Sequence, residues 1–210
     1  EWGAVAYLTN SKYGRCTNES CTEVTINNCV TFVTGIGADS VSASSSSTTC
    51  TTAANKYNGA KGVLASTTGN ITGVYDMSGG AFEYTMGNVS NASGSYTFYP
   101  SSSGFAGSWY TTSTAKYVTT YANGSSSADQ VAYNRGRLGD ATGEIVLSSG
   151  SGWYSDYAAF PYSDGSWFSR GDFNYSSTEA GVFYFGHYYS NTYGNGSYMD
   201  SSRATLVSLK

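Results

Sequence analysis

The stretch Gly73-Val74-Tyr75-Asp76-Met77-Ser78-Gly79-Gly80-Ala81-Phe82-Glu83-Tyr84 joins a glycine-rich turn to a short aromatic run. Adjacent glycines mark turns, because glycine adopts backbone conformations that other residues avoid. The run from Gly80 to Tyr84 has the aromatic content typical of a β-strand. We therefore expect a turn that leads into a strand, with two carboxylates, Asp76 and Glu83, along it.

Two helices are expected before this stretch. Residues 1 to about 12 place four apolar side chains where one face of a helix can bury them, and Gly14 follows as a stop. Residues 53–61 repeat Ala and Tyr at helical spacing and end before Gly62. Between the two, residues 22–26 alternate as a strand would, and a Ser/Thr-rich loop follows.

The rest of the chain predicts few strands and long loops. It consists mostly of short aromatic or β-branched runs, such as Ala180 to Phe185, separated by Gly, Asn and Ser. The chain has 210 residues, of which 40% are hydrophobic, enough for one large domain with a core. We predict an α+β fold that forms a single domain over residues 1–210.

Composition indicates a secreted or cell-surface protein. Only 11% of the residues are charged, and Ser, Thr, Asn, Gly and 20 Tyr supply the polar surface, as in secreted adhesive proteins. The net charge is −4 and no cluster of Lys or Arg occurs, so nucleic acid is a poor candidate partner. Apolar runs fall far short of the ~20 residues of a membrane span. Because the first residues read as the middle of a helix, we expect the C-terminal part of a longer chain.

Four cysteines, Cys16, Cys21, Cys29 and Cys50, permit three disulfide connectivities. We favour local pairing, Cys16 with Cys21 and Cys29 with Cys50. Zinc is the alternative, but the spacing lacks paired C-x-x-C units, and the single histidine, His187, is far away in the sequence.

Segments spread along the chain resemble the formylglycine-generating-enzyme family, whose fold is a variant of the C-type lectin fold. Residues 1–7, EWGAVAY, resemble the family's EAEWEYAAR-type helix, and residues 73–84 are similar to its GLYDMSGNVWEW signature. Residues 167–173, WFSRGDF, resemble its RGGSW or RGGSF segment, and Ser202-Arg203-Ala204-Thr205-Leu206 stands where the family ends with GFR and a hydrophobic strand. The resemblance implies a C-type-lectin-like fold of few short antiparallel strands, two helices and extensive loops.

The resemblance does not extend to the family's chemistry. Its enzymes oxidise a substrate cysteine by means of two cysteines in the C-terminal part, and this chain has no cysteine after Cys50. Serine or tyrosine cannot replace thiolates as ligands of Cu(I). His187 has no accompanying nucleophile motif, so we interpret it as a surface or packed histidine. We therefore expect a protein that is not an enzyme.

Calcium is the cofactor that the resemblance implies. It places calcium ligands on the side chains of Asp76 and Glu83 and on the backbone carbonyls of Gly79 and Ala81. Calcium prefers six to eight hard oxygens, which such a turn can supply. The alternative is that Asp76 closes a turn and that Glu83 pairs with a basic residue such as Arg170 or Arg203.

Tyrosine and asparagine crowd the C-terminal part. Tyrosine offers a large, rigid contact surface, whereas Ser, Gly and Asn adapt their hydrogen bonds to a partner, as in antibody paratopes. The same stretch resembles the variable region of retroelement-diversified proteins with this fold. The alternative is that tyrosine is abundant throughout the chain. The candidate ligand-binding residues are Phe168, Asp172, Phe173, Asn174, Tyr175, Tyr184, His187, Tyr188, Tyr189, Asn191, Tyr193 and Tyr198.

These observations predict a non-catalytic extracellular recognition or adhesion domain whose partner is a protein or glycan ligand. A second reading is structural: the globular head of a pilin-like filament subunit, whose partners are neighbouring subunits. An exposed fibre surface would carry Ser, Thr, Asn and Tyr equally well.

Overall fold

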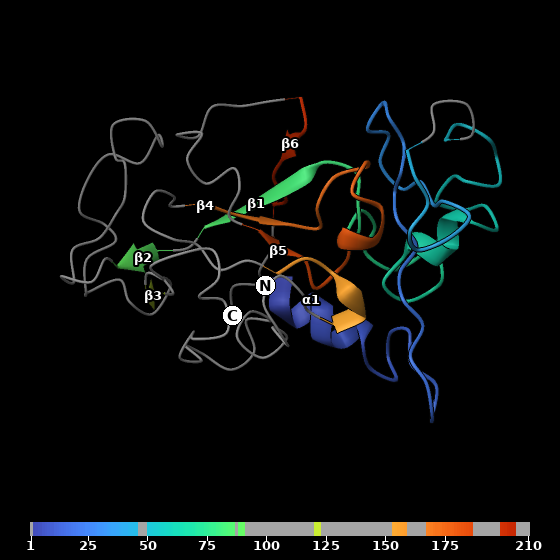
Figure 1. Cartoon of the computed structure of the whole chain (residues 1–210). Coiled ribbons are helices and arrows are strands. Elements are labelled where there is room, and N and C mark those ends of the chain that lie inside the picture. The colour runs from blue at the N-terminus through green and yellow to red at the C-terminus, as the bar shows by residue number, and fades with distance from the viewer. Residues whose placement is uncertain are drawn as a thin grey trace.

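The computed structural model of the chain describes residues 2–45, 50–86, 88–90, 120–122, 153–158, 167–186 and 198–204. This part combines one α-helix, a four-stranded mixed sheet and long loops (Figure 1). The α+β class is thereby confirmed. Within the described ranges, three short 3-10 helices lie in the loops: Gly62–Ala65, Trp153–Ser155 and Ser177–Glu179.

The helix α1 spans Trp2–Thr9 and packs its first turn into the core. The indole Nε1 of Trp2 donates to the backbone carbonyl of Val182 at 2.8 Å, so the helix is bonded to a segment 180 residues later in the chain. The helix ends earlier than expected, because the N–H groups of Gly14 and Cys16 both donate to the Ser11 carbonyl and close turns there.

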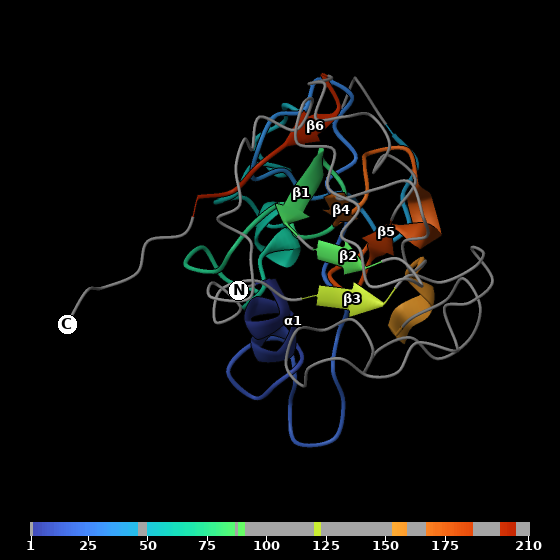
Figure 2. The same ribbon diagram turned by 90° about the vertical axis from the view of Figure 1, so that its left-hand side faces the viewer.

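The central strand is β1, Phe82–Met86, and it follows the glycine-rich turn as expected. It pairs antiparallel with β4, Trp167–Arg170, and parallel with β6, Asp200–Ser201. Strand β5, Phe185–Gly186, extends the sheet beyond β4 and gives the order β5-β4-β1-β6. In Figures 1 and 2 these strands step down from β6 at the top to β5, with α1 below them.

A second, two-stranded sheet lies on the far side of the molecule from the N-terminal loops (Figure 1). Its strands β2, Asn88–Ser90, and β3, Thr120–Ala122, run parallel. Both sheets thus contain a parallel pair, whereas the sequence led us to expect antiparallel strands.

The main core joins the helix to the signature turn. It buries apolar side chains from four separate segments: Trp2, Ala6, Val24, Met77, Val182 and Phe183. Met77 comes from the middle of the turn, so burial of this one side chain anchors the turn to the core. A second group of rings continues the core under β1, where Phe82 lies 4.9 Å from Phe173, centroid to centroid.

The predicted disulfides, Cys16–Cys21 and Cys29–Cys50, are both confirmed. The second is buried, and it packs with Ile36 at the base of the N-terminal loops. Disulfides persist in oxidising compartments, with which this pair of bonds is consistent. Among the described residues, no helix is both long and apolar enough to cross a bilayer.

The second predicted helix, residues 53–61, is wrong. This segment forms turns whose backbone groups bond to a neighbouring loop: Gly37 N–H donates to the Asn55 carbonyl at 2.8 Å, and Asn55 Nδ2 donates to the Gly37 carbonyl at 2.7 Å. Residues 22–26 form no strand, contrary to expectation, and their burial does not alternate. Thr25 N–H donates to the Leu64 carbonyl in a loop, and both Val24 and Ile26 are buried.

Candidate functional site

The glycine-rich turn is held on both sides by backbone hydrogen bonds. On one side, Asn27 N–H donates to the Ser78 carbonyl at 2.8 Å and Gly80 N–H donates to the Asn27 carbonyl at 2.7 Å. On the other, Gly79 N–H donates to the Gly171 carbonyl at 2.8 Å. Gly79 and Gly80 have φ of 70° and 77°, a region that favours glycine.

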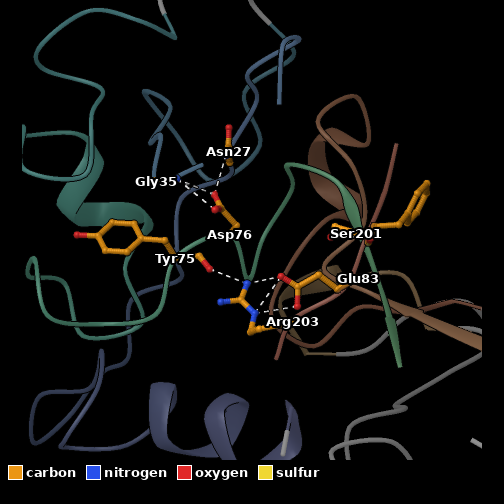
Figure 3. Close-up of polar contacts among 8 residues, drawn as sticks. Asn27, Gly35, Tyr75, Asp76, Glu83, Ser201 and Arg203 are labelled. Atoms are coloured by element: carbon orange, nitrogen blue, oxygen red, sulfur yellow. Dashed lines mark hydrogen bonds and ion pairs between the residues drawn. The ribbon is translucent and has the colours of Figure 1, made fainter. Parts of the chain in front are cut away.

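Asp76 directs its carboxylate at the N-terminal loop that runs past the turn (Figure 3). Its Oδ1 accepts a hydrogen bond from Asn27 Nδ2 at 2.7 Å, and both of its oxygens accept from the Gly35 N–H at 3.1 Å. Asp76 therefore fastens the loop of residues 27–35 to the turn, a contact between distant segments.

Glu83 directs its carboxylate the other way, at Arg203 just after β6 (Figure 3). Arg203 Nε donates to both Glu83 oxygens, at 3.0 and 2.9 Å, and Arg203 Nη2 also contacts Glu83 Oε1. Nη2 donates in addition to the Tyr75 carbonyl at 2.9 Å. The pairing alternative is thus realised with Arg203, whereas Arg170, opposite Glu83 in β4, lies over the Phe185 ring at 4.4 Å.

Burial makes both carboxylates of the turn weaker acids than usual. It raises the pKa of Asp76, although the hydrogen bonds from Asn27 and Gly35 oppose that rise. It likewise raises the pKa of Glu83, and the bonds from Arg203 oppose the rise there. In each case the hydrogen-bond donors favour the ionised form of the carboxylate, against the effect of burial.

A pocket of about 390 Å³ opens beside these two carboxylates. This volume lies near the lower end of the range of roughly 300–1,000 Å³ that small-molecule pockets have. The walls combine three carboxylates, one guanidinium, several small polar groups and two aromatic rings. The lining residues are Asn27, Phe32, Thr34, Asp76, Gly80, Ala81, Glu83, Tyr198, Asp200, Ser201, Ser202 and Arg203.

The rings of Phe32 and Tyr198 meet edge to face at 5.9 Å, in the geometry that aromatic pairs prefer. Tyr198 is 80% exposed, so most of its ring remains accessible at the mouth of the pocket. Tyr175, also from the candidate C-terminal set, is 61% exposed. Both are large apolar surfaces open to a partner.

The arrangement of the turn does not fit a calcium ion. Calcium needs six to eight oxygens that converge on one point. The carboxylates of Asp76 and Glu83 point apart, and each is bonded to protein donors. Among the described residues, no group of three or more His, Cys, Asp or Glu side chains could hold a metal ion. Gly79 donates its N–H to the Gly171 carbonyl, and Ala81 lines the pocket.

Three of the candidate ligand-binding residues are buried. Asp172 is 2% exposed, and its Oδ1 accepts from the Phe173 N–H at 2.8 Å. Asn174 Nδ2 donates to the Cys29 carbonyl at 2.8 Å, which fastens this segment to the disulfide-bonded loop. Tyr184 is buried beside Phe82. These three side chains support the surface rather than forming it, and Phe173 is partly buried between Phe82 and Tyr175.

Five other candidate residues lie outside the described residues: His187, Tyr188, Tyr189, Asn191 and Tyr193. They remain predictions. Phe168 lies in β4, where it pairs with Thr85.

Three residues that organise the site were not anticipated from the sequence. Asn27 bonds Asp76 across 49 positions, Gly35 binds the same carboxylate, and Phe32 contacts Tyr198. Asn27 lies two residues before Cys29, and Phe32 and Gly35 lie in the loop between Cys29 and Cys50. No local motif marks them, because their role arises from contacts between distant segments.

A separate carboxyl, Asp156, is completely buried near Phe183. Its Oδ2 accepts from the Phe183 N–H at 2.9 Å, and its Oδ1 has no hydrogen-bond partner. Burial raises the pKa of Asp156 well above its usual range, and the negative charges of Glu23 and Asp172 add to the rise. Because it does not line the pocket, we assign it a structural role.

Comparison with protein-family models, with curated proteins and with solved structures finds no significant match to this chain, so its function has to be inferred from its own residues and contacts.

Proposed function

We propose that this chain is a non-catalytic extracellular recognition domain that binds a protein or glycan ligand through a tyrosine-rich surface in its C-terminal part. The single observation that carries the proposal is the exposed ring of Tyr198 at the mouth of a polar pocket. Exposed tyrosines beside small polar groups are the contact chemistry of recognition surfaces.

The frame beneath this surface supports the proposal, because it is fixed in several ways. Asn174 is bonded to the Cys29 carbonyl, and Phe32, three residues after Cys29, contacts Tyr198. The Cys29–Cys50 disulfide anchors the same loop. Contact residues held on a rigid frame lose little conformational entropy on binding, which favours affinity.

The C-type-lectin-like, formylglycine-generating-enzyme-type fold is part of the proposal. Its support is that the resembling segments meet in space although they lie far apart in the sequence. Trp2 of the first segment shares a core with Met77 of the second. Glu83 of the second lies opposite Arg170 of the third and pairs with Arg203 of the fourth.

A screen of the purified domain on arrays of glycans and extracellular proteins would test the proposal. We expect a defined set of ligands whose binding falls about tenfold or more when Tyr175 and Tyr198 are both replaced by serine. A second variant, with serine at positions 188, 189 and 193, tests the tyrosines outside the described residues in the same way.

The matched control is Tyr13→Ser, because Tyr13 is 72% exposed but follows α1 and does not line the pocket. Binding should be unchanged in this variant. Undiminished binding by both tyrosine variants would sink the proposal. Polymerisation of the domain without any ligand on the arrays would favour the filament head instead.

A further inference from the structure

The guanidinium of Arg203 occupies a position that joins three parts of the molecule. It bonds Glu83 in the central strand through Nε and Nη2, and it bonds the Tyr75 carbonyl in the turn through Nη2. Arg203 itself follows β6, two residues after the strand ends. One cation thus holds the turn, β1 and the β6 end together.

The partners of this cation are a carboxylate and a backbone carbonyl, the two kinds of oxygen that also bind hard metal ions. Glu83 is only 8% exposed in its side chain, and its burial without a positive partner would be costly. A bidentate guanidinium satisfies both of its oxygens at once. A metal ion at the same carboxylate would have to displace Arg203.

Asp76, the second carboxylate of the turn, is not shared with Arg203 through a hydrogen bond. Its oxygens accept instead from Asn27 and from the Gly35 backbone. Its charge nevertheless lies close enough to Arg203 for the two to attract each other. Arg203 therefore balances the charge of Glu83 and offsets part of that of Asp76 without drawing the two carboxylates together.

We infer that Arg203 is a built-in cation that takes the place of a structural calcium ion, so that the turn of residues 76–83 and the docking of β6 need no metal. One consequence rests on the proposed function: because Tyr198 precedes β6 and Arg203 follows it, ligand binding at this surface is independent of calcium.

Thermal unfolding of the purified chain tests the inference directly. The melting temperature of the wild-type protein should be the same in EDTA and in millimolar calcium. Arg203→Gln should lower it by about 5 °C, since it leaves the buried Glu83 without a positive partner. Arg203→Lys keeps the charge but loses the two-pronged geometry, and it should fall between the two.

The matched control is Lys61→Gln, which removes the cation of the ion pair between Lys61 and Asp39. Both members of that pair are exposed, so the melting temperature should change by less than about 2 °C. Terbium luminescence, excited through the aromatic side chains, provides a second readout. Any terbium signal of the wild-type protein should be the same in Glu83→Gln, because no terbium ion binds at Glu83.

The inference would be overturned if the wild-type protein melted at a lower temperature in EDTA than in calcium, or if it gave a terbium signal that depends on Glu83. An unchanged melting temperature in Arg203→Gln would do the same. None of these measurements depends on ligand binding to the arrays, so the inference can fail while the proposed function holds. If no ligand on the arrays bound the protein and its melting temperature were independent of calcium, the proposed function alone would be contradicted.

Discussion

Asp76 combines an unusual backbone conformation with a side chain that closes a loop. Its φ is 59°, in the left-handed region that most residues avoid and that Asn and Asp tolerate best. Its carboxylate accepts hydrogen bonds from Asn27 and Gly35. Backbone preference and side-chain bonding thus both favour an Asx residue at this position.

Two substitutions at Asp76 test the combined effect of the acceptor and the backbone conformation. Asp76→Ala removes the acceptor and adds backbone strain, so we expect it to lower the free energy of unfolding by about 2–4 kcal/mol. Asp76→Asn keeps one acceptor oxygen and tolerates the positive φ, so its loss should be less than half as large. Urea unfolding followed by tryptophan fluorescence measures both, and equal losses would show that neither the single acceptor oxygen nor tolerance of the positive φ stabilises this position.

How far the site could be predicted differs between these two carboxylates. The partner of Glu83 was within reach, because few basic residues are available and Arg203 lies in a segment with a family resemblance. The partner of Asp76 was not, because Asn27 precedes it by 49 residues and belongs to no recognisable motif. A carboxylate in the sequence predicts that a donor exists, but only the folded chain identifies it.

At the level of elements, the N-terminal loops are long and contain little regular structure. Two disulfides cross-link these loops, which lack the hydrogen bonds of a sheet. Cys29–Cys50 spans 21 residues and is buried, whereas Cys16–Cys21 spans 5 residues near the surface. A cross-link that closes a longer loop removes more entropy from the unfolded chain.

Replacing each cysteine pair by alanine should therefore destabilise the protein to different degrees. We expect a loss of about 3 kcal/mol without Cys29–Cys50 and about 2 kcal/mol without Cys16–Cys21, from the loop-closure entropy. Denaturant unfolding of the two double variants, under oxidising conditions, gives the comparison. A larger loss for the shorter loop would mean that native packing, rather than loop closure, dominates.

The elements that the sequence predicted well are those with strong local signals. The helix α1 buries Trp2 and Ala6, although Leu8, one of the apolar side chains expected on the buried face, is 56% exposed; β1 has an aromatic run after paired glycines. Residues 53–61 carry a helical pattern too, but their backbone bonds to the loop at Gly37 instead. The nearby disulfide and the close approach of Gly62 to Lys56 hold this segment in turns. Tertiary contacts thus override a weak local preference.

At the scale of the whole molecule, Asp156 and Asp172 are buried and Glu23 is partly buried, and none of the three forms an ion pair within the described part of the chain. Burial raises the pKa of Asp172 to about 6 and that of Glu23 to about 7, and it raises the pKa of Asp156 well above its usual range. Asp156 feels the charges of both of the others, so the three act on each other. In the unfolded chain the same groups titrate near pH 4.

Stability should therefore fall as the pH rises. A carboxyl with a raised pKa in the folded state binds its proton more tightly there than in the unfolded chain, so its stabilising effect is complete below about pH 4 and is lost as the pH passes about 6 to 7. Asp172 alone should lower the free energy of unfolding by roughly 1–2 kcal/mol between pH 5 and pH 8. Urea unfolding across this range measures the slope. Asp172→Asn keeps an acceptor for the Phe173 N–H and tolerates the positive φ of 59°, so it should flatten the slope without abolishing folding. Constant or increasing stability from pH 5 to pH 8 would mean that these carboxyls ionise in the folded protein as readily as in the unfolded chain, and that the core around Asp156 is open to water.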